Sequence, residues 1–189
     1  MTASRAAYAF AKLKFPGRDK IFLCYLSTMM IPWYVILIPQ FFIMQKLHLY
    51  DTHWSLILTG AFNVFGVFLL RQNMLSIPDS LAEAAKIDGC GPWGIYVKII
   101  LPLCKTSLAT LVVLTFNSVW NDYMGPMIYL DTDSKKTIQL GLATFRRQFD
   151  TDYGVIMAGT TLSLIPVVIL YAVAQKYIVE GIAYAGVKG

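Results

Sequence analysis

The sequence predicts an all-α fold, a polytopic membrane helical bundle of about four transmembrane helices with an additional cytoplasmic helix. Of its 189 residues, 57% are hydrophobic and only 14% are charged, whereas a soluble domain is about a quarter charged. Charges are absent from four long stretches, 21–45, 54–70, 106–121 and 153–175. A helix needs about 20 residues to cross the hydrocarbon core, so each stretch is close to the length of a span.

We expect spans over about 21–45, 54–70, 103–122 and 153–175. The third begins near Leu103, because its uncharged run is short and Lys105 can extend to the membrane interface. Pro32 and Pro39 predict kinks in the first span and Pro166 in the fourth, because proline lacks an N–H and clashes with the preceding turn. These kinks fit either a translocation path or a purely structural bend.

The loop charges predict the orientation. Residues 1–20, 71–105 and 176–189 together carry 11 Lys and Arg against 5 acids, a net charge of +6. Residues 46–53 and 122–152 carry 5 against 6, a net charge of −1. The positive-inside rule places the first set, with both termini of this chain, in the cytoplasm. The overall charge of +5 is therefore explained without a nucleic-acid partner, for which the basic residues are too sparse.

The long cytoplasmic segment between the second and third spans, 71–105, is predicted to fold. Ser80 to Glu83 matches a capping box, which marks the start of a helix. Gly89 can take the left-handed conformation that ends a helix. Pro92 suits the first turn of a second helix, which is expected to end before Leu101-Pro102.

The first of these two helices is too short and too polar to span the membrane. Its small residues Ala82, Ala84 and Ala85 allow close approach by another chain, and Glu83 and Asp88 place charge beside them. The residues fit two alternatives equally well, a docking element for a cytosolic partner or a passive amphipathic helix on lipid headgroups.

A family resemblance bears on this choice. Glu83-Ala84-Ala85, followed at fixed spacing by Gly89, Ile99 and Leu101-Pro102, resembles the EAA motif of binding-protein-dependent ABC importer permeases. The flanking stretches, from "AAYAFAKLKFPG" to "QKYIVEGIAYAGVKG", resemble the maltose-type carbohydrate permease subunits. The resemblance covers essentially the whole chain, which we therefore treat as one permease transmembrane domain over 1–189.

The resemblance implies a mechanism. In that family the EAA helix is the coupling helix, which sits in a cleft of the ATP-binding subunit and moves with it to drive alternating access. The residues implied in coupling are Glu83, Ala84, Ala85, Asp88, Gly89, Ile99, Leu101 and Pro102. The C-terminal residues implied to reach the same interface are Gly186, Val187, Lys188 and Gly189.

The implied partners are a dimer of ATP-binding subunits, a second permease subunit and an extracellular solute-binding protein, in the bacterial inner membrane. The implied substrate is a carbohydrate: an oligosaccharide, a polyol or a glycerol phosphate. The outer loop 122–152 is a candidate contact for the binding protein. Members of the family usually have six membrane helices, so the chain is expected to be truncated at its N-terminus by about two.

Polar side chains within or beside the spans are candidates for a carbohydrate path, namely Asn63, Asn117, Trp120 and Asn121. The alternative is ordinary hydrogen bonding between helices. Asp122 fits either the path or an anchor for its helix. His48 and His53 lack a ligand set for a metal, and the three cysteines show neither metal-binding nor disulfide spacing.

No Walker A, G-x-S-x-G or H-E-x-x-H motif is present. The chain is therefore expected to be a transport subunit rather than an enzyme, without a cofactor of its own, and ATP and Mg²⁺ are expected on a separate subunit. Two alternatives remain: a non-functional fragment, or a self-contained channel or secondary transporter. The latter would be expected to carry ionisable residues within its spans, and the four uncharged runs have none.

Overall fold

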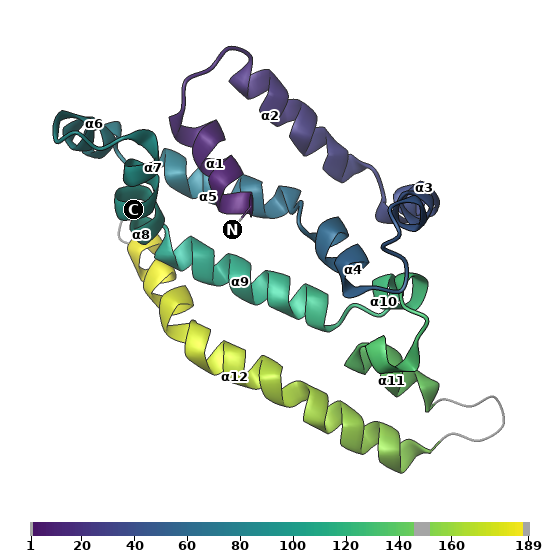
Figure 1. Cartoon of the computed structure of the whole chain (residues 1–189). Coiled ribbons are helices and arrows are strands. Elements are labelled where there is room, and N and C mark those ends of the chain that lie inside the picture. Colours follow the sequence, from purple (N-terminus) through teal and green to yellow (C-terminus); the bar gives the residue numbers. More distant parts are fainter. Residues whose placement is uncertain (1, 146–151, 187–189) are drawn as a thin grey trace. The chain divides into compact units, whose positions relative to one another are not determined.

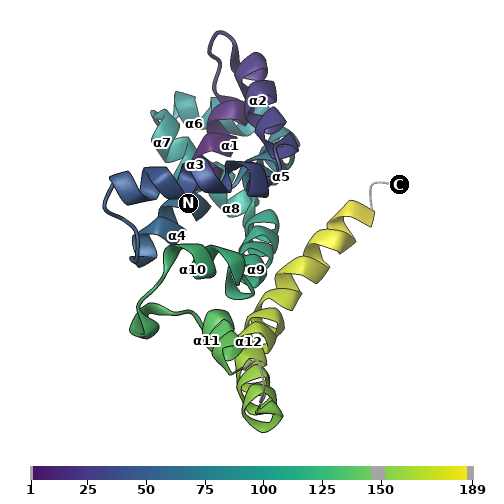
Figure 2. The ribbon, with the colours of Figure 1, turned by 90° about the vertical axis from the view of Figure 1, so that its right-hand side faces the viewer.

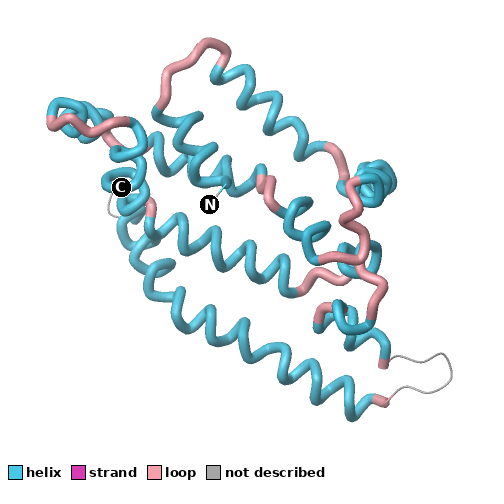
Figure 3. Tube along the Cα trace, viewed as in Figure 1, coloured by secondary structure: helices cyan, strands magenta, loops and turns pink. Residues whose placement is uncertain are grey.

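The computed structural model describes the backbone of residues 2–145 and 152–186, and the side chains of residues 2–145 and 152–175. The predicted all-α class is confirmed, because the described residues form helices joined by loops and contain no strand (Figure 3).

The helices follow one another along the chain as labelled in Figure 1. Those of the first half are α1 (Thr2–Lys12), α2 (Arg18–Ser27), η1 (Thr28–Met30), α3 (Trp33–Lys46), α4 (His53–Gly60), α5 (Val64–Leu75) and α6 (Asp79–Ile87). Those of the second half are α7 (Pro92–Ile95), η2 (Tyr96–Ile100), α8 (Leu101–Leu103), α9 (Lys105–Trp120), α10 (Met124–Tyr129), η3 (Asp133–Lys135), α11 (Ile138–Thr144) and α12 (Tyr153–Gly186).

Two helical stretches are long and apolar enough to cross a membrane, His53–Leu75 with a mean hydropathy of 1.6 and Tyr153–Gln175 with 2.1. The number rises to four among the described residues if each of two bent pairs counts as one span. These pairs are Arg18–Met30 with Trp33–Lys46, and Pro92–Leu103 with Lys105–Trp120. Each of the four predicted spans therefore overlaps a candidate span or a bent pair.

Proline interrupts the first of these pairs. Ile31 is extended, with φ −82° and ψ 113°, and the helix ends before Pro32. Proline disfavours the helical conformation in the residue before it, so the predicted kink at Pro32 is a complete break. Pro39 and Pro166 instead lie inside the continuous helices α3 and α12.

The chain divides into two compact units. Unit 1 comprises Met1–Pro32, Phe62–Val112 and Lys176–Gly189, and unit 2 comprises Trp33–Ala61 and Val113–Gln175.

The core of unit 1 forms where α1 lies along α5 (Figures 1 and 2). Ala3, Ala7 and Ala11 recur every fourth residue and are all buried, so α1 presents a smooth face that permits close helix packing. On α5, Leu70 and Met74 are fully buried in the same cluster.

In unit 2, hydrogen bonds and an ion pair join segments that are about 80 residues apart in the sequence. The Asp51 carboxylate accepts hydrogen bonds from the backbone N–H groups of Asp131 and Thr132 at 2.9 and 3.0 Å, and from the Lys135 ammonium at 2.8 Å. Asp51 has a left-handed φ of 53°, and its own N–H donates to the Tyr129 carbonyl at 2.9 Å. We call these contacts the Asp51 clasp.

Candidate functional site

The start of α6 differs from the predicted capping box. The helix begins at Asp79 with Pro78 at its N-cap, and no side chain caps it. Ser80 is therefore already the second helical residue, where its hydroxyl no longer occupies the N-cap position that the box requires. Asp79 in the first turn instead places a negative charge at the positive end of the helix dipole. The predicted box is wrong, although a helix over this segment is present.

Lys12, the last residue of α1, is tied to the start of α6. Its side chain is only 6% exposed, and its ammonium donates to the Ile77 carbonyl and to the Asp79 carboxylate, both at 2.6 Å. This hydrogen bond and the positive charge of Lys12 hold the pKa of the Asp79 carboxyl below its usual value of 3.8. We call this contact the Lys12 clamp. It links the start of α6 to the α1–α5 core.

The end of α6 forms the predicted turn. Gly89 has a left-handed φ of 81°, which confirms the conformation expected from the sequence. The Cys90 N–H donates to the Ala85 carbonyl at 2.8 Å, and the Gly89 N–H donates to the Lys86 carbonyl at 3.0 Å. These two bonds define a Schellman motif, which satisfies carbonyls at the end of the helix.

The following helix starts at Pro92, as expected, but it continues beyond its predicted end. A five-residue π-helix, η2, leads into α8, so Pro102 lies inside the helical run. The prediction that the helix ends before Leu101-Pro102 is therefore wrong. A π-helical segment is wider than an α-helix, and we attribute the tolerance of the proline ring and its missing N–H to that local widening.

The two faces of α6 have different surroundings. Ala85 is buried at 6% exposure in the core of unit 1. Glu83, Ala84 and Asp88 are exposed. Ile87 is 87% exposed, an unusually high value for a large apolar residue, and sequence reasoning did not single it out. The exposed surface of α6 therefore combines two large apolar side chains, Leu81 and Ile87, with two carboxylates.

The other residues implied in coupling occupy varied positions. Ile99 and Leu101 are partly buried against the core of unit 1, and Pro102 is exposed. Gly186 is the last residue of α12, whereas residues 187–189 lie outside the described residues.

A cavity of about 240 Å³ lies between α1 and α6. Its charged lining residues come from both helices and the loop between α1 and α2: Lys12, Lys14, Asp79, Glu83 and Lys86. Glu83, which is exposed, thus also borders a hollow with mixed charge.

The candidate path residues make hydrogen bonds within the chain. Asn63 is the N-cap of α5, and its side chain accepts from the Gly66 N–H at 2.8 Å. Asn121 donates to the Asn117 carbonyl at 2.8 Å and to its side-chain oxygen at 3.1 Å. The Trp120 indole N–H donates to the Ser163 carbonyl at 3.0 Å. The structure brings Asn117, Trp120 and Asn121 together in unit 2, whereas Asn63 belongs to unit 1.

Asp122, for which two roles were open, supports the local structure. Its carboxylate accepts from the Gly125 N–H at 3.1 Å in the first turn of α10. Among the described residues, no group of three or more His, Cys, Asp or Glu is placed to hold a metal ion.

Comparisons with known proteins identify the class. Residues 3–184 match the family model described as "Binding-protein-dependent transport system inner membrane component", and the chain belongs to this family. It is therefore a multi-pass inner-membrane component of an ABC transporter.

Individual relatives extend the comparison. The chain is 37% identical over 187 residues to an arabinooligosaccharide transport system permease protein of Halalkalibacterium halodurans, covering 99% of this chain and 67% of the relative. It is 40% identical over 186 residues to a probable ABC transporter permease of Bacillus subtilis, covering 97% and 62%. It resembles a chain in the crystal structure of a bacterial ABC transporter involved in alginate import, with a TM-score of 0.83 and 30% identity, covering 93% and 69%. The chain thus spans about two thirds of the length of these relatives.

Proposed function

We propose that the chain is a transmembrane permease subunit of an ATP-driven importer of carbohydrate, and that α6 couples ATPase movement to alternating access. Family membership supports the transport role. The printed names of relatives support the substrate class, since they include permeases for arabinooligosaccharides, lactose and starch degradation products.

The geometry of α6 is the observation that carries the coupling proposal. Ala85 anchors one face of the helix in the core, while Glu83, Ala84 and Ile87 are exposed on its outward side. A well-packed apolar side chain surrounded by polar groups is a common arrangement at the centre of a protein interface. Movement of a partner that gripped this face would be transmitted through the Lys12 clamp to α1 and through the Schellman turn to α7.

The partition of the chain supports the proposed orientation. Unit 1 contains all three segments whose net charge is +6, and unit 2 contains both segments whose net charge is −1. The two units therefore contain the same two sets of loops that the positive-inside rule places on opposite sides of the membrane. On this basis α6 and both termini of the chain are cytoplasmic.

The proposed partners follow from the family. Two ATP-binding subunits would hold ATP and Mg²⁺, a second permease subunit would complete the pathway, and a solute-binding protein would deliver the sugar from outside. Under this proposal the chain itself has no catalytic residue and no cofactor.

Reconstitution tests the proposal. The chain is co-expressed with the ATPase, second permease subunit and binding protein of its system, and uptake of labelled arabinotriose and maltotriose into proteoliposomes is measured. Uptake that needs both ATP and the ATPase subunits supports the proposal. Uptake by this chain alone, without ATPase subunits, would instead establish a self-contained transporter, and the absence of carbohydrate uptake by the full assembly would refute the importer role.

A further inference from the structure

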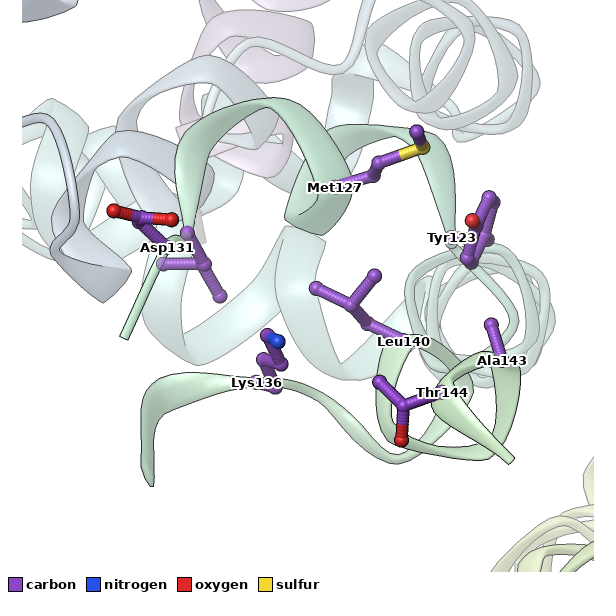
Figure 4. Close-up of a pocket in the computed structure, with 8 residues that line it drawn as sticks. Tyr123, Met127, Asp131, Lys136, Leu140, Ala143 and Thr144 are labelled. Carbon is purple, nitrogen blue, oxygen red and sulfur yellow. The ribbon is translucent and has the colours of Figure 1, made fainter. Parts of the chain in front are cut away.

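A second cavity lies in unit 2, within the predicted outer loop 122–152 and next to the Asp51 clasp. It has a volume of about 290 Å³ and lies among α10, α11 and the segments that flank them (Figure 4). This volume is at the lower end of the range for small-molecule sites, about 300–1,000 Å³. The cavity is therefore large enough for part of an oligosaccharide rather than for a long segment of one.

The lining combines an apolar floor with a polar edge. Leu140 is buried at 7% exposure, and in Figure 4 it lies between the side chains of Tyr123 and Lys136. Tyr123 and Met127 are exposed, so their apolar surfaces are accessible from the cavity. Sugar rings present a C–H face surrounded by hydroxyl groups, which an aromatic ring beside hydrogen-bonding side chains complements.

Lys136 supplies the hydrogen-bonding group at this edge, because its ammonium can donate to sugar hydroxyls. In Figure 4 the Asp131 carboxylate points away from Leu140, so Asp131 contributes negative charge beside the cavity rather than a hydrogen bond. The Thr144 hydroxyl donates to the Gly141 carbonyl at 2.7 Å and also points away from Leu140.

The polar edge is held in place by neighbouring contacts. The Asp131 N–H is fixed by the Asp51 clasp, with the Asp51 carboxylate 2.9 Å away. The Lys136 ammonium donates to the Asp133 carboxylate at 2.6 Å. Groups that are already positioned lose less conformational entropy on binding, so these contacts favour a site that exists before the ligand arrives.

We propose that this cavity is a binding subsite for one ring of a neutral oligosaccharide. The inference rests on the proposed import of carbohydrate and adds a location and a charge preference to it. Asp131 and Lys136 oppose each other in charge, and Asp133 compensates Lys136 further, so the edge has no positive excess to attract a uronate. Neutral sugars are therefore preferred to acidic ones.

Protection of an introduced thiol tests the proposal in the assembled importer. Cys24 and Cys90 are replaced by serine, while Cys104 is buried at 1% exposure and is retained. Thr144→Cys introduces the reporter, and a membrane-impermeant maleimide measures its rate of alkylation. Tyr153→Cys is the matched control, because Tyr153 is 68% exposed in the same unit and does not line the cavity.

Arabinotriose or maltotriose is expected to slow alkylation of Thr144→Cys and to leave Tyr153→Cys unchanged, whereas a uronate trisaccharide gives no protection. Adding Tyr123→Ala is expected to raise the concentration needed for half-protection by about tenfold, because the aromatic contact is lost. Absence of protection by both neutral sugars, equal protection by the uronate, or equal protection of both reporters would overturn the subsite. Uptake separates the two hypotheses: an importer that transports sugar without protecting the reporter contradicts only the subsite, whereas one that transports no sugar contradicts the proposed function.

Discussion

Replacing Gly89 by alanine should disrupt the turn that ends α6 without any steric clash. A Cβ at this position would meet no heavy atom within 4 Å, so the penalty comes from the backbone alone. A residue with a Cβ pays about 1–2 kcal/mol to hold a left-handed conformation such as the φ of 81° found here. That penalty lowers the population of the closed turn by about five- to thirtyfold relative to its open forms.

The chain offers a matched control two residues further on. Gly91 has a φ of −71°, which other residues adopt readily, and a Cβ there also meets nothing within 4 Å. Gly91→Ala should therefore have little effect, and Gly89→Asn should be milder than Gly89→Ala because asparagine tolerates the left-handed region.

Hydrogen–deuterium exchange measures the turn directly. The Cys90 N–H, which donates to the Ala85 carbonyl at 2.8 Å, should lose protection by about five- to thirtyfold in Gly89→Ala. In the assembled importer the same variant should lose sugar uptake and sugar-stimulated ATP hydrolysis, as should the bulkier Gly89→Leu. Equal protection of Cys90 in the Gly89→Ala and Gly91→Ala variants would refute the conformational argument. Lost protection with normal uptake would refute only the coupling role.

Three further predictions concern packing and charge. Leu70→Ala should lower the stability of unit 1 by about 2–5 kcal/mol, because Leu70 is fully buried. With Cys24 and Cys90 replaced by serine, the fluorescence of a thiol-reactive dye should report earlier exposure of buried Cys104 on heating. Lys12→Met should weaken coupling more than it weakens membrane insertion, because it removes the ammonium that makes both hydrogen bonds to the segment at the start of α6. Sugar-stimulated ATP hydrolysis measures this effect, and normal stimulation would contradict it. Asp51→Asn should increase proteolysis of unit 2 at neutral pH. Hydrogen bonds from the Lys135 and Thr132 side chains, in that order, lower the pKa of Asp51 below its usual 3.8, so the clasp contributes its full stability above about pH 4 and loses it only as the pH falls through the lower folded-state pKa. Wild-type proteolysis should therefore be constant between pH 5 and 8, and a rise within that range would contradict the assignment.

Local chemistry explains what the sequence could predict about this fold. Uncharged runs locate the apolar helices because a charge within the hydrocarbon core is costly. Gly89 and Pro92 mark the end of one helix and the start of the next, since each residue has a backbone preference that neighbours seldom override. The EAA resemblance then placed the candidate site on the segment that the structure folds as α6.

The features that the sequence could not predict depend on contacts between distant residues. Lys12 and Asp79 are 67 positions apart, so the ion pair that ties the start of α6 to α1 has no local sequence pattern. The outward position of Ile87 follows from burial of the opposite face against the core of unit 1, which helix periodicity alone cannot assign to a partner. The Asp51 clasp, formed across 80 to 84 positions, likewise has no local pattern.

The proposed coupling requires that the outward face of α6 contacts an ATP-binding subunit. A photoreactive amino acid in place of Ile87, the most exposed large apolar residue among the described ones, tests this contact directly in the assembled importer. We expect a covalent product between this chain and the ATPase at position 87, with a yield that changes when ATP binds, and no such product from the same substitution at Tyr153. An intact complex that gives no ATPase cross-link at position 87, with or without ATP, would contradict the account.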